Sequence, residues 1–570
     1  MTHGGDLLVE MLLRHEVAVV FGIAGGQTLP LYDAIRSRRP RIRHIPCRDE
    51  RNAGYAADAY ARLTGKVGVC DATVGPGAIK FVSSLGEAFN ASIPIIAIVS
   101  DMPSDWLAVR YRGGGNQLVD QKAILAPVSK WTCRLPQTDL IPEMVRRAFQ
   151  MATSGRPGPV VIEFPEDLFK QESDASLLEV DARFGTVPPH RPAPDPNSVS
   201  EALELLKTAS QPVMIAGGGA NLSKAGEAIL RLAEHLAMPV ATTHSGMGVV
   251  PETHPLALGV LGALGGSTAA RTYVEGADVI LAVGFKFGQN PTFRWQLPRP
   301  DQRIIQIDID GTEIGKIFPV EVGMVADVRV GLEALLLAEP APRQMEPVVE
   351  DVAGLKAEWK REIEAQAVEA QPIKPQYVMS LVNELAGPDD ILVCDASFAS
   401  GWGSMYYEMR QNRRALFPRG LAGLGWGLPA AIGAHVARPG ANIIVLAGDG
   451  AMTFSLGELA TLAQEGMNVK VVILNNSAMG WIKWDQAVAW DGKFISTDLD
   501  DVDFAMAARG LGCQSSRVKE SKELRDAISQ ALALEGPVVL DVRTTVGDTP
   551  VSKFIASKEG KERILSDSRQ

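Results

Sequence analysis

The stretch 443–481, IIVLAGDGAMTFSLGELATLAQEGMNVKVVILNNSAMGW, decides the fold of this chain. It begins with an apolar run, 443–447, that has the length of a buried strand, and a Gly-Asp-Gly turn follows. Leucine and alanine residues then repeat with helical spacing between 456 and 463, and Gly466 is placed to end that helix. A second apolar run, 469–474, predicts a strand parallel to the first. The stretch therefore predicts a strand–helix–strand unit.

A polar residue follows each of these two strands. Both strand ends open on the same edge of a parallel sheet, where ligands of doubly wound folds bind. We therefore expect Asp449 and Asn476 to be neighbours, although 24 residues separate Gly450 from Asn475. One carboxylate and one amide oxygen suit Mg²⁺, which completes its octahedron with phosphate oxygens and water. An ordinary strand-end aspartate and a pair of loop asparagines would have the same spacing.

The Gly-Asp-Gly turn, the 24-residue spacing and the Asn-Asn pair together resemble the signature of thiamine diphosphate (ThDP) enzymes. The resemblance implies that Asp449, Asn476 and the main-chain carbonyl of Ala478 hold a Mg²⁺ ion that fixes the cofactor's diphosphate. It also implies that the backbone at Gly448, Gly450 and Ala451 lies against the cofactor.

Length and composition exclude several classes of protein. The chain has 570 residues, 46% of them hydrophobic and 22% charged, which predicts three or four globular domains. Its net charge of -11 argues against a nucleic-acid partner. The five scattered cysteines predict a cytoplasmic protein with reduced thiols. Neither a signal peptide nor an apolar run long enough to cross a membrane is visible, so we expect no membrane partner.

Strands and helices alternate in the first third of the chain, which predicts a doubly wound parallel sheet in residues 1–185. The expected strands are 17–23, 42–46, 67–71, 93–100 and 160–164.

Glu50 follows the second of these strands and precedes an Ala-rich helix that should be buried. A carboxylate there costs free energy unless it is paired or protonated, so Glu50 is a candidate functional residue. A helix N-cap, or an ion pair with Arg48 or Arg51, would also explain it. The segment 47–53 resembles the family segment whose glutamate donates to the ThDP aminopyrimidine. In the family this favours the imino form that removes the thiazolium C2 proton, and the resemblance makes Glu50 catalytic.

The wider resemblance is to the acetolactate (acetohydroxyacid) synthase branch. It is carried by the segments 20–26, 29–34, 73–77, 156–160 and 420–433. It places Gly25 and Gly77 against the cofactor and Gln117 opposite the reacting atoms. The paired histidines of pyruvate decarboxylases are absent, since Gly113-Gly114-Gly115-Asn116 stands there. This argues against a simple aldehyde-releasing decarboxylase.

A proline-rich stretch, 187–196, is expected to link the first domain to a second α/β domain, 195–338. The expected strands there are 213–216, 240–243, 279–283 and 304–309. The Gly217-Gly218-Gly219 turn precedes a helix and is typical either of a nucleotide phosphate site or of a tight turn without a ligand. Relatives carry FAD or ADP in this domain, but 284–290 departs from the FAD-binding pattern. Lys286 keeps a positive charge near the substrate there.

The last domain is expected over 374–548, after a linker, 339–347, and a charged helix, 351–370. The resemblance places Ser397, Gly423 and Met479 against the cofactor. It also gives Leu424 the position of the residue that props ThDP into its bent shape, although a plain core leucine would have the same spacing.

Two departures from the synthases concern the substrate. Phe398 and Ala399 replace the family's diphosphate-contacting Gln and His, and Asp485 stands near the position of the synthases' acceptor-selecting tryptophan. Trp481 and Met479 are expected to line the acceptor pocket, with a core role as the alternative. The charged segment 549–570 is interpreted as a disordered tail or a closing lid. Its cations could meet CoA phosphates or form a solvated face: Lys553, Lys558, Lys561 and Arg563.

The resemblance thus implies an α/β fold of three doubly wound parallel-sheet domains, which are pyrimidine-binding, central and diphosphate-binding. It implies a homodimer or homotetramer in which Glu50 of one chain meets the Asp449 site of another. The expected reaction is ThDP- and Mg²⁺-dependent carbon–carbon bond cleavage or formation on a 2-oxo acid, as in acetolactate synthases. A 2-hydroxyacyl-CoA lyase or oxalyl-CoA decarboxylase acting on an acyl-CoA is the alternative. A non-catalytic ThDP-binding subunit is a third interpretation, which intact Glu50, Asp449 and Asn476 disfavour.

Overall fold

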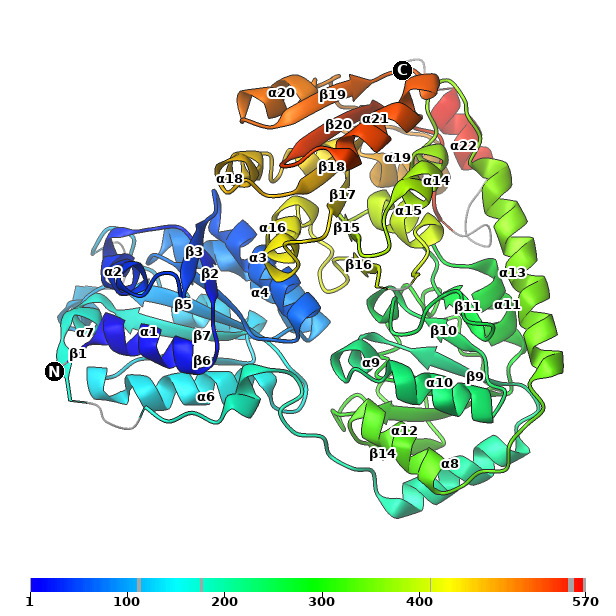
Figure 1. The fold of residues 1–570 in the computed structure, drawn as a ribbon, viewed down its shortest axis with the longest axis horizontal. Coiled ribbons are helices and arrows are strands. Elements are labelled where there is room, and N and C mark those ends of the chain that lie inside the picture. Colours follow the sequence, from blue (N-terminus) through cyan, green and yellow to red (C-terminus); the bar gives the residue numbers. More distant parts are fainter. Residues whose placement is uncertain (1, 110–113, 175–177, 411, 552–557, 567–570) are drawn as a thin grey trace. The chain divides into compact units, whose positions relative to one another are not determined.

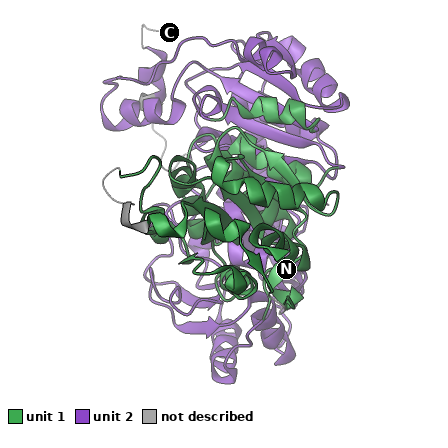
Figure 2. Ribbon diagram, turned by 90° about the vertical axis from the view of Figure 1, so that its left-hand side faces the viewer, with its two compact units in different colours: residues 1–190, 418–439, 455–467 green, residues 191–417, 440–454, 468–570 purple. Residues whose placement is uncertain are grey.

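The computed structural model describes residues 2–109, 114–174, 178–410, 412–551 and 558–566. The described chain contains three six-stranded sheets, and every strand pair within them is parallel. The predicted α/β fold with three doubly wound parallel sheets is therefore confirmed. The chain divides into two compact units, which Figure 2 colours separately: 1–190, 418–439 and 455–467 form unit 1, and the remainder forms unit 2.

The first sheet lies in unit 1 and has the strand order β3-β2-β4-β5-β7-β6. Its strands are β2 (Val19–Gly22), β3 (Arg43–Pro46), β4 (Gly68–Ala72), β5 (Ile95–Asp101), β6 (Trp131–Arg134) and β7 (Val160–Pro165). The helices of this part are α1 (Gly4–Arg14), α2 (Leu29–Ser37), α3 (Glu50–Thr64), α4 (Pro76–Ala91), α5 (Gln121–Leu125), α6 (Ile141–Thr153) and α7 (Glu166–Lys170). The apolar sides of α1, α2 and α6 form one core with the sheet (Figure 1). A short antiparallel pair, β1 (Thr2–His3) and β8 (Glu172–Ser173), lies outside it.

The second sheet, in unit 2, has the order β11-β10-β9-β12-β13-β14. Its strands are β9 (Pro212–Ala216), β10 (Val240–Thr242), β11 (Ala257–Val260), β12 (Val279–Val283), β13 (Arg303–Asp308) and β14 (Val322–Val325). Met214 and Ala216 face the core of α8 (Pro196–Thr208), α10 (Gly226–His235) and α12 (Val328–Leu337). Val213 and Ile215 face the core that includes α11 (Thr268–Gly276) and α13 (Glu346–Gln366). This alternation buries both faces (Figure 1).

The third sheet, also in unit 2, has the order β16-β15-β17-β18-β20-β19. Its strands are β15 (Ile391–Cys394), β16 (Arg414–Leu416), β17 (Ile443–Gly448), β18 (Val469–Asn475), β19 (Gln514–Val518) and β20 (Val538–Arg543). The helices of unit 2 around it are α14 (Pro375–Leu385), α15 (Phe398–Tyr406), α17 (Asp449–Met452), α19 (Gly480–Ala489), α20 (Phe504–Gly510), α21 (Ser521–Ala533) and α22 (Lys558–Leu565). Two further helices, α16 (Gly427–Ala437) and α18 (Glu458–Gln464), belong to unit 1, where α16 packs against α3.

Six strands of the three six-stranded sheets escaped prediction, and five of these lie at sheet edges: β6, β11, β14, β16 and β19. Each of the five is short and contains at least one glycine or polar residue, so they lack the continuous apolar run that marks a strand buried on both faces. The sixth, β20, is interrupted by Asp541 and pairs with β18 and β19. No helix in the described part of the chain is long and apolar enough to cross a membrane.

The turn at Gly217–Gly219 is explained by packing. A Cβ on Gly217 would lie 2.2 Å from the Gly284 carbonyl oxygen, and one on Gly219 would lie 2.7 Å from Gly284 Cα. The helix that follows, α9 (Gly218–Leu222), is only five residues long. Of the two interpretations of this turn, the tight turn without a ligand accounts for its glycines.

His15 is a buried titratable group in unit 1. Its ring stacks on Phe149 with 3.8 Å between centroids, and neither ring nitrogen has a hydrogen-bond partner. Burial, with the nearby Arg146 charge, lowers the pKa of His15 to about 4.

Stability should therefore fall as pH drops from about 6.5 to about 4, because His15 binds a proton in the unfolded chain but not in the folded protein. The full effect is about 3 kcal/mol, at 1.36 kcal/mol per pKa unit. Denaturant unfolding across this pH range should show a weaker pH dependence for His15→Leu than for the wild type. The exposed His190 supplies the control His190→Gln, and equal slopes for all three proteins would contradict the assignment.

Candidate active site

The predicted strand–helix–strand unit is confirmed, and it brings Asp449 and Asn476 to one sheet edge. Strands β17 and β18 pair in parallel, with Gly448 opposite Leu474. Asp449 begins the short helix α17 directly after β17, and Asn476 comes directly after the last residue of β18. The two side chains therefore leave neighbouring strands at the same end.

Asp449 is a buried carboxylate that its surroundings only partly satisfy. Its Oδ1 accepts a hydrogen bond of 2.9 Å from the Gly450 N–H, but its buried Oδ2 has no hydrogen-bond partner. Burial raises the pKa of Asp449 to about 6, and the backbone N–H groups of Gly450, Ala478 and Ser477 oppose that rise. A cation at Oδ2 would compensate the buried charge.

The rest of this edge leaves room for a ligand. A Cβ on Gly448 would have no heavy atom within 4 Å, whereas one on Gly450 would lie 2.6 Å from the Met479 sulfur. Asn476 is half-buried, and its Oδ1 accepts a 3.2 Å hydrogen bond from the Ala478 N–H. In the described part of the chain no three His, Cys, Asp or Glu side chains gather as a metal site. The predicted set has a single carboxylate, so the residues present fit Mg²⁺ whose other ligands are phosphate oxygens and water.

Four residues without a glycine's freedom adopt a left-handed backbone near the predicted cofactor residues. Their φ angles are +65° for Gln117, +68° for Ser397, +54° for Ala422 and +52° for Ser477. Such conformations are uncommon for these residue types and persist only where the surrounding structure enforces them. Two of them, Gln117 and Ser397, are themselves predicted site residues.

The segment that follows the Asn pair folds back over Gly450. Met479 N–H donates to the Thr497 carbonyl (2.8 Å), and Leu499 N–H donates to the Ser477 carbonyl (2.8 Å). The fully buried Lys483 Nζ pairs with Asp498 Oδ1 at 2.5 Å and fixes this arrangement. A Cβ on Gly450 would also lie 3.5 Å from the Leu499 side chain. Met479 and Leu499 thus form an apolar wall beside the predicted metal residues.

Trp481 packs at the edge of a core, which is the alternative role considered from the sequence. Its ring lies 5.4 Å from that of Phe398, and it borders a small core that includes Leu264 and Ile564. Its indole Nε1–H donates to Asp485 Oδ2 at 2.9 Å. Lys286, the other residue predicted for the substrate pocket, opposes the burial-driven rise of the Asp308 pKa.

In unit 1, Glu50 is the first residue of α3. Asp49 is the N-cap, because its carboxylate accepts from the Arg51 N–H at 2.9 Å. Glu50 Oε2 lies 3.1 Å from Lys80 Nζ, so Glu50 has an ion-pair partner that the sequence did not indicate. Gly77 lies close to it, since a Cβ there would lie 2.9 Å from Glu50 Oε1.

The remaining predicted residues of the first sheet gather around the 73–77 loop. A Cβ on Gly25 would lie 2.3 Å from Thr73 Cβ, and one on Gly75 would lie 2.0 Å from the Gln117 carbonyl oxygen. The buried Gln121 holds this loop, since it accepts from the Gly75 N–H at 2.9 Å and donates to the Ser100 carbonyl at 2.9 Å. Unit 1 therefore brings together Gly25, Glu50, Gly77 and Gln117. Gly113, shortly before Gln117 in the chain, lies outside the described residues.

Among the buried carboxylates of unit 1 that sequence reasoning missed, two contact segments that carry predicted site residues. Glu458 accepts from the Arg48 N–H (2.8 Å) and from Asn52 Nδ2 (2.9 Å), and so holds the start of α3 on both sides of Glu50. Burial raises the pKa of Glu458. The other is Glu87 in α4, which is 1% exposed.

Glu87 holds the loop that carries Gly423 and Leu424. It accepts the backbone N–H groups of Gly420, Leu421 and Ala422 at 2.8, 2.6 and 3.0 Å. Arg62 donates to Glu87 at 3.0 Å and to the buried Asp58 at 2.8 Å. Gly423 is close to α3, since a Cβ on it would lie 3.0 Å from the Tyr55 hydroxyl, and Leu424 is half-buried. A glutamate inside an apolar helix was the available signal.

The predicted site residues divide between the units shown in Figure 2. Unit 1 carries Gly25, Glu50, Gly77, Gln117, Gly423 and Leu424. Unit 2 carries Lys286, Ser397, Gly448, Asp449, Gly450, Ala451, Asn476, Ala478, Met479 and Trp481.

Three family models match this chain. The N-terminal thiamine pyrophosphate (TPP, the same molecule as ThDP) binding domain matches residues 2–124, the central domain 199–335 and the C-terminal TPP-binding domain 395–542. The chain belongs to the thiamine pyrophosphate enzymes. Similar proteins include a probable acetolactate synthase large subunit of Methanocaldococcus jannaschii, which is 33% identical over 95% of this chain and 91% of the relative. An acetolactate synthase large subunit of Corynebacterium glutamicum is 33% identical over 94% and 86%. An acetolactate synthase of Arthrospira platensis is 33% identical over 95% and 94%.

This membership makes the protein a ThDP-dependent enzyme, and the expected cofactor is confirmed. The roles of individual residues stay predictions, which the buried Asp449 and the gathering of Glu50, Gly77 and Gln117 support.

The C-terminal segment contains a packed helix. Helix α22 lies against α19, where Arg563 donates to the Ala487 carbonyl at 2.7 Å and pairs with Asp491 at 3.3 Å. Lys561 pairs with Asp548 at 2.7 Å. A disordered tail is therefore wrong for residues 558–566. Lys553 and the side chain of Lys558 lie outside the described residues.

Removing Glu87 should loosen the 420–422 backbone. Glu87→Ala leaves three N–H groups without their acceptor and removes one of the two carboxylates that pair with the buried Arg62, so the free energy of unfolding should fall by about 3 kcal/mol. Hydrogen exchange of the three amides should accelerate. Glu16→Ala, which removes an exposed partner of Lys66, should cost under about 1 kcal/mol. Unchanged exchange at 420–422 would contradict the role of Glu87.

Proposed function

We propose that this ThDP enzyme is an acetolactate synthase-like carboligase that needs Mg²⁺, decarboxylates a 2-oxo acid and joins the remaining fragment to a second carbonyl compound. The observation that carries the proposal is the match over nearly the whole chain to proteins named acetolactate synthase. When bound, ThDP supplies the carbon nucleophile. The protein supplies position, proton transfer and the exclusion of water.

The proposed cofactor-binding roles fall into two groups, one for each unit of the chain. Asp449, Asn476 and the Ala478 carbonyl hold Mg²⁺, and the open backbone at Gly448 admits the diphosphate. The buried, unpartnered Oδ2 of Asp449 supports this assignment. Glu50 would hydrogen-bond the aminopyrimidine and serve as its acid–base partner, and Leu424 would support the bent shape of the cofactor.

The remaining roles concern the substrate. Gln117 faces the reacting atoms, Met479 and Trp481 bound the acceptor pocket, and Lys286 supplies positive charge toward the substrate carboxylate. These assignments rest on the resemblance to the synthase branch.

The assembly is proposed to be a homodimer or homotetramer in the cytoplasm, with each active site completed by a second chain. The proposed domains are pyrimidine-binding (1–185), central (195–338) and diphosphate-binding (374–548), followed by a closing segment (549–570). FAD or ADP in the central domain is the remaining cofactor hypothesis, which the packing role of Gly217 and Gly219 does not require.

A CoA-dependent lyase or decarboxylase is the second candidate. It is favoured by Asp485, which stands near the position of the synthases' tryptophan and here accepts a hydrogen bond from Trp481. The tail argues less strongly for CoA than its sequence suggests, because Lys561 and Arg563 are engaged in ion pairs.

Purified protein supplied with pyruvate, ThDP and Mg²⁺ should form acetolactate, and removal of either ThDP or Mg²⁺ should abolish turnover. Acetolactate is measured by its acid-catalysed conversion to acetoin. Turnover that persists without ThDP would refute the proposed chemistry. Exchange of formyl-CoA or acyl-CoA, with pyruvate left unused, would replace the synthase by the CoA-dependent candidate.

Mutations of the predicted site residues in unit 1 and in unit 2 should affect different properties of the enzyme. Glu50→Gln should retain the ThDP/Mg²⁺-induced rise in melting temperature but slow hydrogen exchange at ThDP C2 by about 10²- to 10⁴-fold, since it removes an acid–base group. Asp449→Asn should lose the ligand-induced rise, while its ligand-free fold is at least as stable because a buried charge is gone.

Glu16→Gln and Asp526→Asn, both at exposed positions, are the matched controls. Normal C2 exchange in Glu50→Gln, or normal ligand-induced stabilisation in Asp449→Asn, would disprove the corresponding role.

A further inference from the structure

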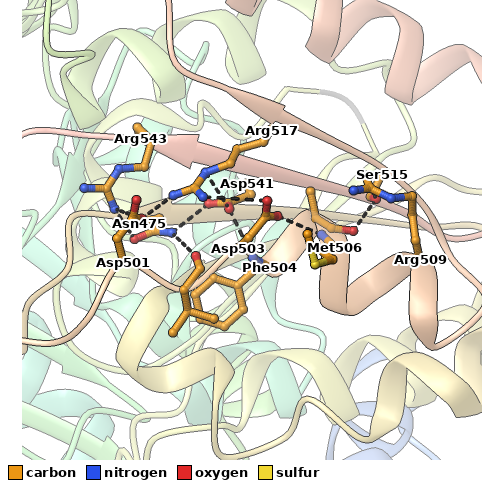
Figure 3. A network of polar contacts seen from close by, with 12 residues as sticks. Asn475, Asp501, Asp503, Phe504, Met506, Arg509, Ser515, Arg517, Asp541 and Arg543 are labelled. Atoms are coloured by element: carbon orange, nitrogen blue, oxygen red, sulfur yellow. Dashed lines mark hydrogen bonds and ion pairs between the residues drawn. The ribbon is translucent and has the colours of Figure 1, made fainter.

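Asn475, the first asparagine of the pair, is fully buried and anchors a polar network (Figure 3). Its Nδ2 donates to Asp541 Oδ1 at 2.8 Å and to the Val502 carbonyl at 3.0 Å. Its Oδ1 accepts a 2.6 Å hydrogen bond from Arg543 Nη1. Both polar atoms of the Asn475 side-chain amide therefore form hydrogen bonds within the protein. These bonds fix the backbone next to Asn476.

Arg543 reaches both sides of Asn476. It is the last residue of β20 and lies directly opposite Asn475 in the parallel register. Its Nη1 also donates to Ser477 Oγ at 2.9 Å, and the guanidinium pairs with Asp501 at 3.0 Å. The Arg543 side chain thus donates hydrogen bonds to Asn475, which precedes Asn476, and to Ser477, which follows it.

The contacts of Arg543 hold a backbone segment that has an uncommon conformation at Ser477. Ser477 has a φ of +52°, a left-handed conformation that a serine adopts only where its surroundings enforce it. Its carbonyl accepts from the Leu499 N–H, and its hydroxyl accepts from Arg543. These contacts set the direction in which the Asn476 side chain and the Ala478 carbonyl leave the turn.

Arg517 forms a second layer of the same network. It pairs with Asp501, with Asp503 at 3.7 Å and with Asp541 at 3.3 Å (Figure 3). Asp541 in turn accepts the Phe504 N–H at 3.1 Å. Because Arg517 interacts with the carboxylates, it reaches Asn475 only indirectly, through Asp541 and through Asp501, which also pairs with Arg543. The network therefore contains a matched pair of arginines at different distances from the turn.

We propose that Arg543 is a positioning residue for the metal-binding turn 475–478. It fixes Asn475 and Ser477 so that the Asn476 amide oxygen and the Ala478 carbonyl are oriented for the divalent cation before it binds. Groups that orient metal ligands contribute strongly to affinity although they do not touch the ion. The inference rests on the proposed metal set of Asp449, Asn476 and Ala478.

The test compares Arg543→Met with Arg517→Met, which remove equivalent guanidinium groups from the two layers. Isothermal titration at saturating ThDP gives the Mg²⁺ dissociation constant. It should rise 10- to 100-fold in Arg543→Met and stay within about twofold in Arg517→Met. Arg543→Lys, which keeps one donor, should recover part of the affinity. In ligand-free protein, amide exchange at Ser477 and Ala478 should accelerate in Arg543→Met alone.

Two outcomes overturn the proposal while the proposed function stands: wild-type Mg²⁺ affinity in Arg543→Met, or equal losses in both arginine variants. Should Arg543→Met fail to fold, Ser477→Ala removes one of the two contacts and should weaken Mg²⁺ binding in the same direction by a smaller factor; wild-type affinity there overturns the proposal as well. Failure of the proposed function looks different. Asn476→Ala would then bind Mg²⁺ and ThDP as the wild type does, and the inference falls with it.

Discussion

The parallel pairing of β17 with β18 is the constraint on which the cofactor edge depends. It places the backbone after Gly448 beside the backbone after Leu474, and so it sets the separation between Asp449 and the 475–478 turn. The pairing with β20 then brings Arg543 opposite Asn475. Three neighbouring strands thus deliver a carboxylate, an amide and a guanidinium to one edge. None of these groups could be displaced along the chain without changing the register of a buried sheet.

Buried carboxylates at the end of β17 and elsewhere in the chain differ in how completely the protein satisfies their hydrogen bonds. Glu87 accepts three backbone N–H groups and an arginine, and Glu458 accepts a backbone N–H and two side chains. Both are satisfied within the protein and fix loops or helix starts. Asp449 is also buried, yet one of its oxygens has no partner, and burial raises its pKa. Asp449 thus differs from the carboxylates that build the framework, and this difference supports its proposed role as a ligand-binding residue. Left-handed serines at 397 and 477 show local strain in the same part of the fold.

The sequence was informative where a single segment carried the signal. Strands β17 and β18 are buried on both faces, so their apolar runs predicted them and their neighbours at the edge. Strands such as β14 and β19 lie at sheet edges with alternating exposure, and no comparable run marks them. Lys80 was not predicted as the partner of Glu50 because it lies a whole strand and turn farther along the chain. Glu87 and Arg543 act on residues hundreds or tens of positions away, and only the fold shows which backbone groups they reach.

The segment 477–499, which follows the Asn pair, is held by contacts other than those that hold the predicted metal residues. Lys483 and Asp498 fix 477–499 as a folded unit, and Trp481 is tied to Asp485 one turn away. An indole bonded to a carboxylate has a fixed ring plane and presents a polar edge, whereas a tryptophan at 485 would present an apolar surface. Arg563 of α22 bonds the far end of the same helix at Ala487. The acceptor side predicted at this helix is therefore shaped by the helix's own contacts. The predicted metal edge depends on strand register, so the acceptor side can change while the metal edge is retained.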